Sequence, residues 1–222
     1  RCAASGTRRC ASIIMKYTDR QKTEGIRTIC YAQNRRVFKM PDSLTFEQGA
    51  ACACESGTAF HALKRLGIGG RDTIAIFGQG PVGASGTLFA KSMGARVIAV
   101  DVVPERLELA KKLGADAVIN ASDGESVDVV RELTHGEGAD ATLDATGIPE
   151  VRNDAVDAAK YWGRVCFVGE GNTTTFDISP QIIHKQLTIY GSWTFSTSGL
   201  AEVAKFVVER NVPLDDLITQ RF

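Results

Sequence analysis

The sequence has no excess of charge of either sign and no long apolar run. Its 222 residues carry 26 Lys and Arg against 26 Asp and Glu, so no bulk positive field is present to attract nucleic acid. No run of about 18 apolar residues occurs, so we expect no transmembrane helix. The first residues, RCAASGTRRC, lack the apolar stretch of a signal peptide. We therefore expect a protein that binds neither nucleic acid nor a membrane.

The six cysteines lack the close spacing of a disulfide framework. They stand at positions 2, 10, 30, 52, 54 and 166. A chain of this length can bury a hydrophobic core without disulfide bonds. We expect free thiols in a reducing, cytoplasmic setting. The sequence also has no internal repeat and no low-complexity tract, so its organisation must be inferred from strand and helix patterns.

The chain changes character near residue 36. Residues 1–36 show weak periodicity, although ASIIMKY and RTICYA could form short strands. After them, short apolar segments alternate with helical patterns, and the predicted strands are 73–78, 96–101, 117–120, 139–146, 164–169 and 187–192. Short apolar strands joined by helices predict an α/β fold, a doubly wound parallel six-stranded sheet of the Rossmann type.

Several helix ends are indicated by residue type. Thr45 is a candidate N-cap for a helix over about 45–52. Ser122 and Glu125 form a candidate capping box for the helix that follows the third strand. Another helix is expected over about 149–162.

The stretch FGQGPVG follows the first predicted strand and opens a helix, which is the context that a phosphate-binding glycine loop requires. Gly78 permits a tight turn, Gly80 lets the backbone approach a pyrophosphate, and Gly83 lets the helix pack closely on the sheet. The start of the helix also offers unpaired N–H groups to phosphate.

Asp101 ends the second predicted strand, 18 positions after Gly83. A carboxylate at this point can accept hydrogen bonds from both hydroxyls of an adenosine ribose. It would also repel a 2′-phosphate, which favours NAD over NADP. The alternative is a plain strand–helix turn followed by a loop acid, with no cofactor at all.

Five segments occur in a familiar order: TIAIFGQGPVGASGTLFAKSMGARVIAVD, DATLDATG, WGRVCFVGEG, LTIYGSWTFS and VPLDDLIT. Together they resemble the cofactor domain of the medium-chain dehydrogenase/reductase superfamily, whose members include the zinc-type alcohol dehydrogenases. The resemblance implies an NAD-binding Rossmann domain over residues 37–222, truncated at its C-terminal end. It implies that residues 1–36 are an irregular remnant of an N-terminal catalytic (GroES-like) domain, so we expect a fragment.

The same resemblance places further residues beside the cofactor. Those expected, besides the three glycines and Asp101, are Thr58, Pro81, Val82, Val102, Arg106, Thr146, Val168, Gly169, Ser192 and Thr194. Arg106 would lie near the adenosine ribose and Thr58 beside the nicotinamide ring. Backbone at Val168 and Gly169 would approach the nicotinamide, and main-chain groups of Ser192 and Thr194 would hold its carboxamide. The alternative for the last two is that they are simple turn residues.

CESGTAFHAL resembles the segment whose cysteine is the third protein ligand of a catalytic zinc, which makes Cys54 a candidate ligand. Zinc of that type takes three protein ligands. The three histidines, His61, His135 and His184, are followed by Ala, Gly and Lys, whereas the ligand histidine of the family is usually followed by Glu. The resemblance therefore implies zinc only in a complete enzyme, and an unligated Cys54 thiol in this chain.

The implied function is the NAD(H)-binding portion of a zinc-type alcohol or polyol dehydrogenase, which transfers hydride between a nicotinamide cofactor and an alcohol or carbonyl substrate. This chain alone would turn over little substrate. Two alternatives stay open: a non-catalytic NAD-binding module, and a zinc-free quinone-reductase-like relative that uses NADPH. The apolar segment LTIYGSWTFS at the expected sheet edge predicts a homodimer through residues 187–196.

Overall fold

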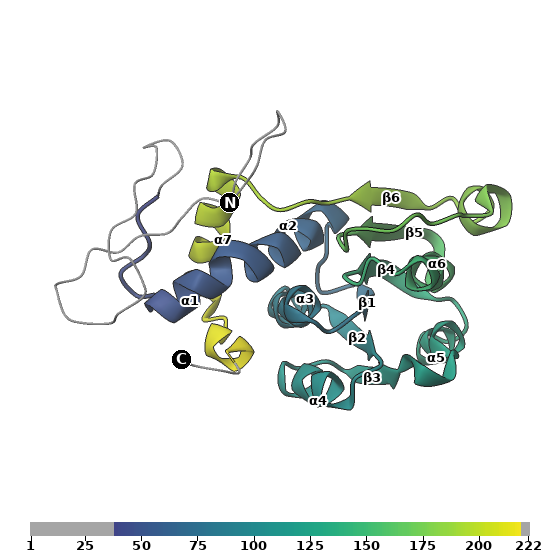
Figure 1. The fold of residues 1–222 in the computed structure, drawn as a ribbon, viewed down its shortest axis with the longest axis horizontal. Coiled ribbons are helices and arrows are strands. Elements are labelled where there is room, and N and C mark those ends of the chain that lie inside the picture. Colours follow the sequence, from purple (N-terminus) through teal and green to yellow (C-terminus); the bar gives the residue numbers. More distant parts are fainter. Residues whose placement is uncertain (1–37, 219–222) are drawn as a thin grey trace.

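Six strands, all parallel, form the centre of the structure in the order β3-β2-β1-β4-β5-β6 (Figure 1). The structure is a computed structural model that describes residues 38–218. The strands are β1 (Thr73–Phe77), β2 (Arg96–Asp101), β3 (Ala117–Asn120), β4 (Ala139–Asp144), β5 (Ala159–Phe167) and β6 (Thr188–Gly191). This order is that of the doubly wound dinucleotide-binding fold, so the predicted fold class is confirmed.

The central strands are apolar throughout because both faces of the sheet are covered. In β1, Ile74 and Ile76 belong to the core on one face, while Ala75 and Phe77 belong to the core on the other. All four are buried. Alternate residues of a strand point to opposite faces, so a strand that is buried on both faces appears in the sequence as an uninterrupted apolar run.

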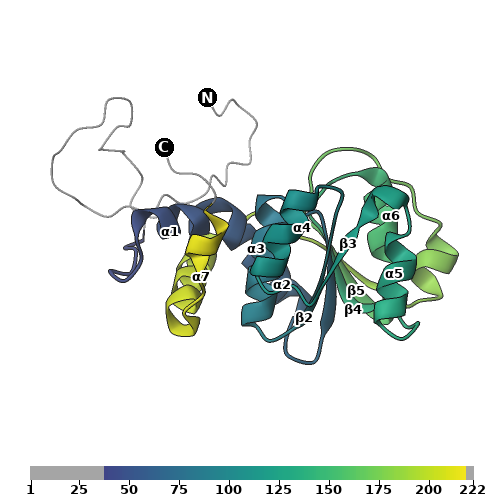
Figure 2. The ribbon, with the colours of Figure 1, turned by 90° about the horizontal axis from the view of Figure 1, so that it is seen from below.

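The covering helices lie on the two sides of the sheet (Figure 2). One side carries α1 (Phe46–Ala51), α2 (Gly57–Leu66), α3 (Pro81–Ser92), α4 (Pro104–Lys112) and α7 (Thr197–Arg210), and the other carries α5 (Ser126–Leu133) and α6 (Pro149–Asp157). Phe60, Phe89 and Phe206 join α2, α3 and α7, with ring centroids 5.1 to 5.9 Å apart. None of the helices within residues 38–218 has the length and apolar character needed to cross a membrane.

The first two predicted helices are one continuous rod. A π-helical turn, Cys52–Ser56, joins α1 directly to α2. Thr45 is the N-cap, as predicted, and its hydroxyl accepts a hydrogen bond from the Gln48 N–H while the Gln48 side chain accepts one from the Thr45 N–H. The rod ends at Gly67, which adopts the left-handed conformation with φ 67°.

Two of the predicted helix boundaries are wrong. The helix predicted to reach residue 162 ends at Asp157, because Lys185 Nζ donates to the carbonyls of Val156 and Asp157 and closes the last turn. The chain then enters β5 at Ala159. The proposed capping box is also absent: Ser122 donates to Asn120 Oδ1 within a short 3₁₀ turn, Ala121–Asp123.

Helix α5 begins at Ser126 instead, and its N-cap Glu125 makes no side-chain cap. The remaining short elements are a π-helical turn at Ile178–Ile183 and a 3₁₀ turn at Leu214–Leu217. The strands predicted within residues 1–36, and the domain remnant proposed there, lie outside the described residues.

Helix α3 packs against the end of β1 at a contact that only glycine allows. A Cβ atom at Gly83 would lie 1.7 Å from the carbonyl oxygen of Gly78. A Cβ atom at Gly80, three residues earlier, would meet nothing within 4 Å. The two glycines therefore have different roles, one in packing and one at an open surface.

We predict that Gly83→Ala lowers the free energy of unfolding by about 3 kcal/mol, because a clash with backbone cannot be relieved by rotating a side chain. Gly80→Ala is the matched control and should cost at most about 1 kcal/mol, since alanine is a poorer N-cap than glycine. Urea unfolding followed by circular dichroism measures both. Equal stability of the two variants would contradict the packing role of Gly83.

Candidate functional site

The carboxyl ends of all six strands meet at one edge of the sheet, because the strands are parallel. Strand β1 lies between β2 and β4, and the chain order reverses at this point. Ligands of doubly wound folds bind in the crevice that forms at such a reversal. Most of the residues predicted to bind a cofactor lie at this edge, in the ends of β1, β2, β4, β5 and β6, the loops after them and the first turns of α3 and α4. Thr58, in α2, is the exception.

The glycine loop forms the bottom of this crevice. Gly78 turns the chain at φ 87°, and its N–H donates to the carbonyl of Val100 in β2. Gly80 is the N-cap of α3, and Pro81 occupies the first turn. The open space at Gly80 lets a ligand reach the backbone at the start of a 12-residue helix, where unpaired N–H groups and the helix dipole favour an anion.

Asp101 stands at the end of β2, buried, and faces the glycine loop. Its Oδ2 accepts the N–H of Gln79 at 2.6 Å, and its Oδ1 accepts the N–H of Val103 at 2.9 Å. Arg106 Nη1, from the first turn of α4, lies 3.6 Å from Oδ2, and the Arg106 side chain is 51% exposed. Each carboxylate oxygen has capacity for a second hydrogen bond, so the acid is both an anchor for the loop and an available acceptor.

Gln79 is a residue that the sequence interpretation missed. It is 2% exposed, and its side chain donates to the carbonyl of Ile76 and accepts from the hydroxyl of Thr87 in α3. The buried Gln79 side chain therefore ties the loop between β1 and α3 to both of these elements. A large polar side chain between two glycines was the available clue, since it must be hydrogen-bonded if buried.

Two exposed apolar side chains flank the crevice. Val102, predicted from the sequence, follows β2 and is 57% exposed, and Ile148, which was not predicted, follows β4 and is 47% exposed. They come from the two strands on either side of β1. Exposed apolar side chains at the edge of the sheet where ligands bind are suited to pack against a flat ring of a ligand.

At the other end of the crevice, the loop after β6 meets the helical rod. A Cβ atom at Gly57 would lie 2.6 Å from the ring of Phe195, so the two segments touch beside Thr58, which is buried. The N–H of Ser192 donates to the carbonyl of Phe167, and its buried Oγ has no hydrogen-bond partner within residues 38–218. Thr194 adopts a positive φ of 50°.

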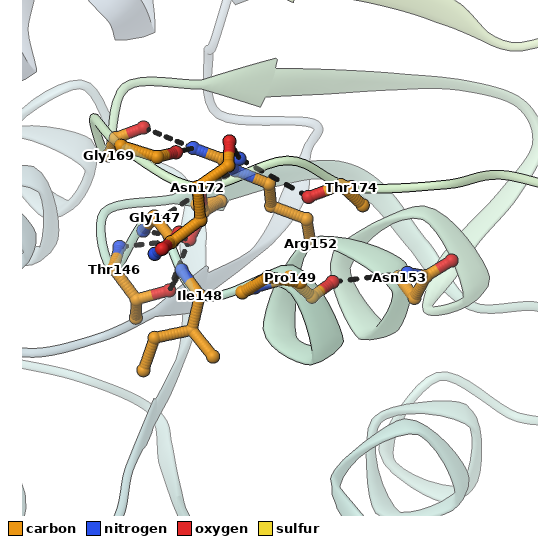
Figure 3. A network of polar contacts seen from close by, with 11 residues as sticks. Thr146, Gly147, Ile148, Pro149, Arg152, Asn153, Gly169, Asn172 and Thr174 are labelled. Carbon is orange, nitrogen blue, oxygen red and sulfur yellow. Dashed lines mark hydrogen bonds and ion pairs between the residues drawn. The ribbon is translucent and has the colours of Figure 1, made fainter.

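The loops after β4 and β5 pack backbone against backbone (Figure 3). Thr146 donates its N–H and hydroxyl to Asp144 Oδ1. The N–H groups of Val168 and Gly169 both donate to the carbonyl of Asp144. A ligand at Val168 and Gly169 would therefore meet carbonyl oxygens rather than free N–H groups.

Cys54 lies in the π-helical turn and is exposed. Burial, and then the neighbouring Glu55 charge, raise the pKa of its thiol, while burial raises the pKa values of Cys52 and Cys166 to about 12. Within residues 38–218, no three His, Cys, Asp or Glu side chains are placed to hold a metal ion. These residues therefore do not fit a catalytic zinc site by themselves.

A cavity of about 620 Å³ opens between the helical rod and the glycine loop. Its polar lining includes Glu55, Ser56, Gln79, Ser85 and Arg106. Gly80 and Pro81 also line it, so the space is continuous with the start of α3.

Comparison with known proteins identifies relatives with similar sequences. The chain is 35% identical over 204 residues to the uncharacterized zinc-type alcohol dehydrogenase-like protein YphC of Escherichia coli (strain K12), which covers 91% of this chain and 58% of that protein. It is 30% identical over 188 residues to the sorbitol dehydrogenase of Bacillus subtilis (strain 168), which covers 84% of this chain and 53% of that protein. The chain thus spans little more than half the length of these relatives.

A solved structure agrees with the sequence matches. The alcohol dehydrogenase rspB of E. coli CFT073, complexed with the cofactor NADH, superposes with a TM-score of 0.75 at 25% identity, over 86% of this chain and 56% of that one. The family model described as zinc-binding dehydrogenase matches residues 81–209, which is more than half of the chain. This chain therefore belongs to the zinc-binding dehydrogenases of the medium-chain dehydrogenase/reductase superfamily, and it covers their cofactor-binding domain.

Proposed function

We propose that this chain is the NAD(H)-binding portion of an alcohol or polyol dehydrogenase. The observation that carries the proposal is the pairing of an open glycine at the start of α3 with a buried acid at the end of β2. The sorbitol dehydrogenase and the NADH-bound alcohol dehydrogenase among its relatives support the same assignment.

The adenosine half of the cofactor would lie over β1 and β2. The diphosphate would meet the backbone at Gly80, Pro81 and Val82. Pro81 has no N–H group, so the unpaired donors at this helix start would come from its neighbours. Asp101 would accept the ribose hydroxyls with its remaining lone pairs, and the Arg106 guanidinium lies beside it. Val102 and Ile148 would cover the adenine ring with apolar surface.

The nicotinamide half would lie over β4, β5 and β6. When bound, the cofactor supplies a hydride acceptor or donor, and the protein supplies position and electrostatics. Backbone at Val168 and Gly169 would approach the nicotinamide, and main-chain groups of Ser192 and Thr194 would hold its carboxamide. The buried Ser192 Oγ, which has no partner within residues 38–218, is a further group available there. Thr146, Thr194 and Thr58 complete this end of the crevice.

In the complete enzyme, Cys54 would be one of three protein ligands of zinc. The other two would come from outside residues 38–218, since this part of the chain supplies no second and third ligand. We therefore propose that the chain alone binds NAD but turns over little alcohol. The thiols of Cys52, Cys54 and Cys166 are free, which is in keeping with the cytoplasmic setting we propose.

We further propose that the chain forms a homodimer through β6 and the residues after it, 187–196. Strand β6 is at the edge of the sheet, and two apolar side chains, Ile189 in the strand and Trp193 just after it, are exposed. An apolar edge strand of this kind readily pairs with a second copy.

The first test of the function is NAD binding. We expect calorimetry on the 222-residue chain to show binding of NAD, and Gly80→Ala to weaken it by at least about tenfold, because a methyl group would stand where the phosphate meets the backbone. Gly70→Ala is the control, since its Cβ would make only an ordinary contact of 3.7 Å. A folded wild-type chain that gives no heat with NAD would refute the proposal.

The second test is cofactor choice. Asp101→Ser should raise the ratio of NADP to NAD affinity by about tenfold or more, because it removes the charge that repels a 2′-phosphate. The ratio is the informative quantity, since any loss of folded protein lowers both affinities equally. Asp116→Ser, which removes an acid outside the crevice loops, should leave the ratio unchanged. An unchanged ratio in Asp101→Ser would mean that Asp101 only anchors the loop.

The third test concerns the dimer. Ile189→Lys should convert a dimer into a monomer, because a charged edge strand opposes pairing. Val208→Lys is a matched control: Val208, in α7, is 37% exposed and Ile189 is 38% exposed. Light scattering at micromolar concentration distinguishes the states. A monomeric wild type, or loss of the dimer in both variants, would count against an interface at β6.

A further inference from the structure

Arg152 is an almost buried arginine whose role is not explained by the cofactor contacts above. It lies in the first turns of α6, and its side chain is 12% exposed. Its guanidinium projects from the helix toward the loop that follows β5 (Figure 3). Nε lies 3.5 Å from Oδ2 of Asp144, whose side chain is fully buried.

The guanidinium makes four hydrogen bonds to one short segment. Nη1 donates to the carbonyl of Asn172 at 3.1 Å and to the hydroxyl of Thr174 at 3.2 Å. Nη2 donates to the carbonyls of Gly169 and Gly171, both at 2.8 Å. The planar fork of an arginine suits such an arrangement, because its donors have fixed directions that a lysine lacks.

The segment that Arg152 contacts lacks the regular backbone hydrogen bonds of a helix or strand. Residues 170–173 are exposed and belong to no helix or strand. Gly171 and Asn172 adopt positive φ angles of 87° and 56°. Fixing such a segment in one conformation costs entropy, and the hydrogen bonds from Arg152 offset that cost.

The same segment begins at the predicted nicotinamide contacts. A Cβ atom at Gly169 would lie 2.1 Å from the nitrogen of Gly147, so the loops after β4 and β5 are in backbone contact. Asn172 Nδ2 donates to the Gly147 carbonyl at 2.9 Å. A shift of the segment would therefore displace Val168 and Gly169 as well.

The segment also reaches the loop after β6. Trp193 Nε1 donates a hydrogen bond to Oε1 of Glu170. Trp193 stands between Ser192 and Thr194, which are the predicted carboxamide contacts. Arg152 is thus connected, through one loop, to the ends of β4, β5 and β6.

We propose that Arg152 is a positioning residue for the nicotinamide half of the cofactor. It fixes residues 169–174 so that the ends of β5 and β6 present one surface to the nicotinamide. This inference rests on the proposed function, because it assigns Arg152 a role in the same crevice. Within residues 38–218, Arg152 makes no hydrogen bond or ion pair to the residues proposed to hold the adenosine half over β1 and β2.

The test compares two ligands, NAD and ADP-ribose, which differ only in the nicotinamide. In Arg152→Met the affinity for NAD should fall by about tenfold, as expected for disrupted hydrogen bonds at one end of the ligand. The affinity for ADP-ribose should change by less than about twofold. A purely structural role would lower both affinities together, since it would reduce the fraction of folded protein.

Arg131→Met is the matched control. Arg131, in α5, also donates to a backbone carbonyl, that of Asp157, and pairs with Asp128, but it contacts none of the crevice loops. Its NAD to ADP-ribose affinity ratio should equal that of the wild type.

Removal of Arg152 leaves Asp144 without its charge partner, so two milder variants provide a second measurement. Arg152→Lys keeps the charge but not the fork, and Asn172→Gly removes the bond to Gly147 while keeping the backbone permissive at positive φ. Both variants should lower the ratio of NAD affinity to ADP-ribose affinity, as Arg152→Met should. Unchanged ratios in the variants that fold would overturn the inference. A wild-type chain that binds ADP-ribose and NAD equally would also overturn it, whereas one that binds neither would overturn the proposed function itself.

Discussion

The contact between Gly83 and Gly78 is the constraint on which the crevice depends. A Cβ atom at Gly83 would lie 1.7 Å from the carbonyl oxygen of Gly78, so α3 approaches the end of β1 more closely than any side chain at this position would allow. This approach places the start of α3 directly over the carboxyl edge of the sheet. The helix dipole and the unpaired N–H groups then face the crevice rather than the surrounding solvent. Without it, the glycine loop would still turn, but its helix could not point at a ligand.

Two acids flank this point in similar ways and serve different purposes. Asp101 at the end of β2 and Asp144 at the end of β4 each accept backbone N–H groups of a following loop, and each has an arginine from the next helix within 3.6 Å. Arg106 is half exposed, so its pair is open to a ligand, whereas Arg152 is almost buried, so its pair is closed. In the function that we propose, the open pair would contact the ligand and the closed pair would hold the shape of the site.

The strands were predictable because burial on both faces leaves continuous apolar runs, and the glycine loop because its spacing is set by backbone geometry. Other features depended on partners that no local pattern contains. The end of α6 is set by Lys185, which lies 28 residues beyond Asp157. Arg152 bonds mainly to carbonyl oxygens, which every residue possesses, so its partners left no trace in residue types. The capping box failed because Asn120 competed for Ser122.

The end of the crevice where we propose that the nicotinamide binds is assembled from segments that are far apart in the chain. Thr58 belongs to the helical rod, and Ser192 follows the last strand, yet the contact between Gly57 and Phe195 brings their segments together. Cys54 lies four residues before Thr58 on the same rod, and its neighbours Glu55 and Ser56 line the cavity that Gly80 and Arg106 also border. The rod therefore contacts the loop after β6 through Gly57 and faces the glycine loop as well. In the complete enzyme that we propose, zinc ligands from outside residues 38–218 would have to approach this rod at Cys54.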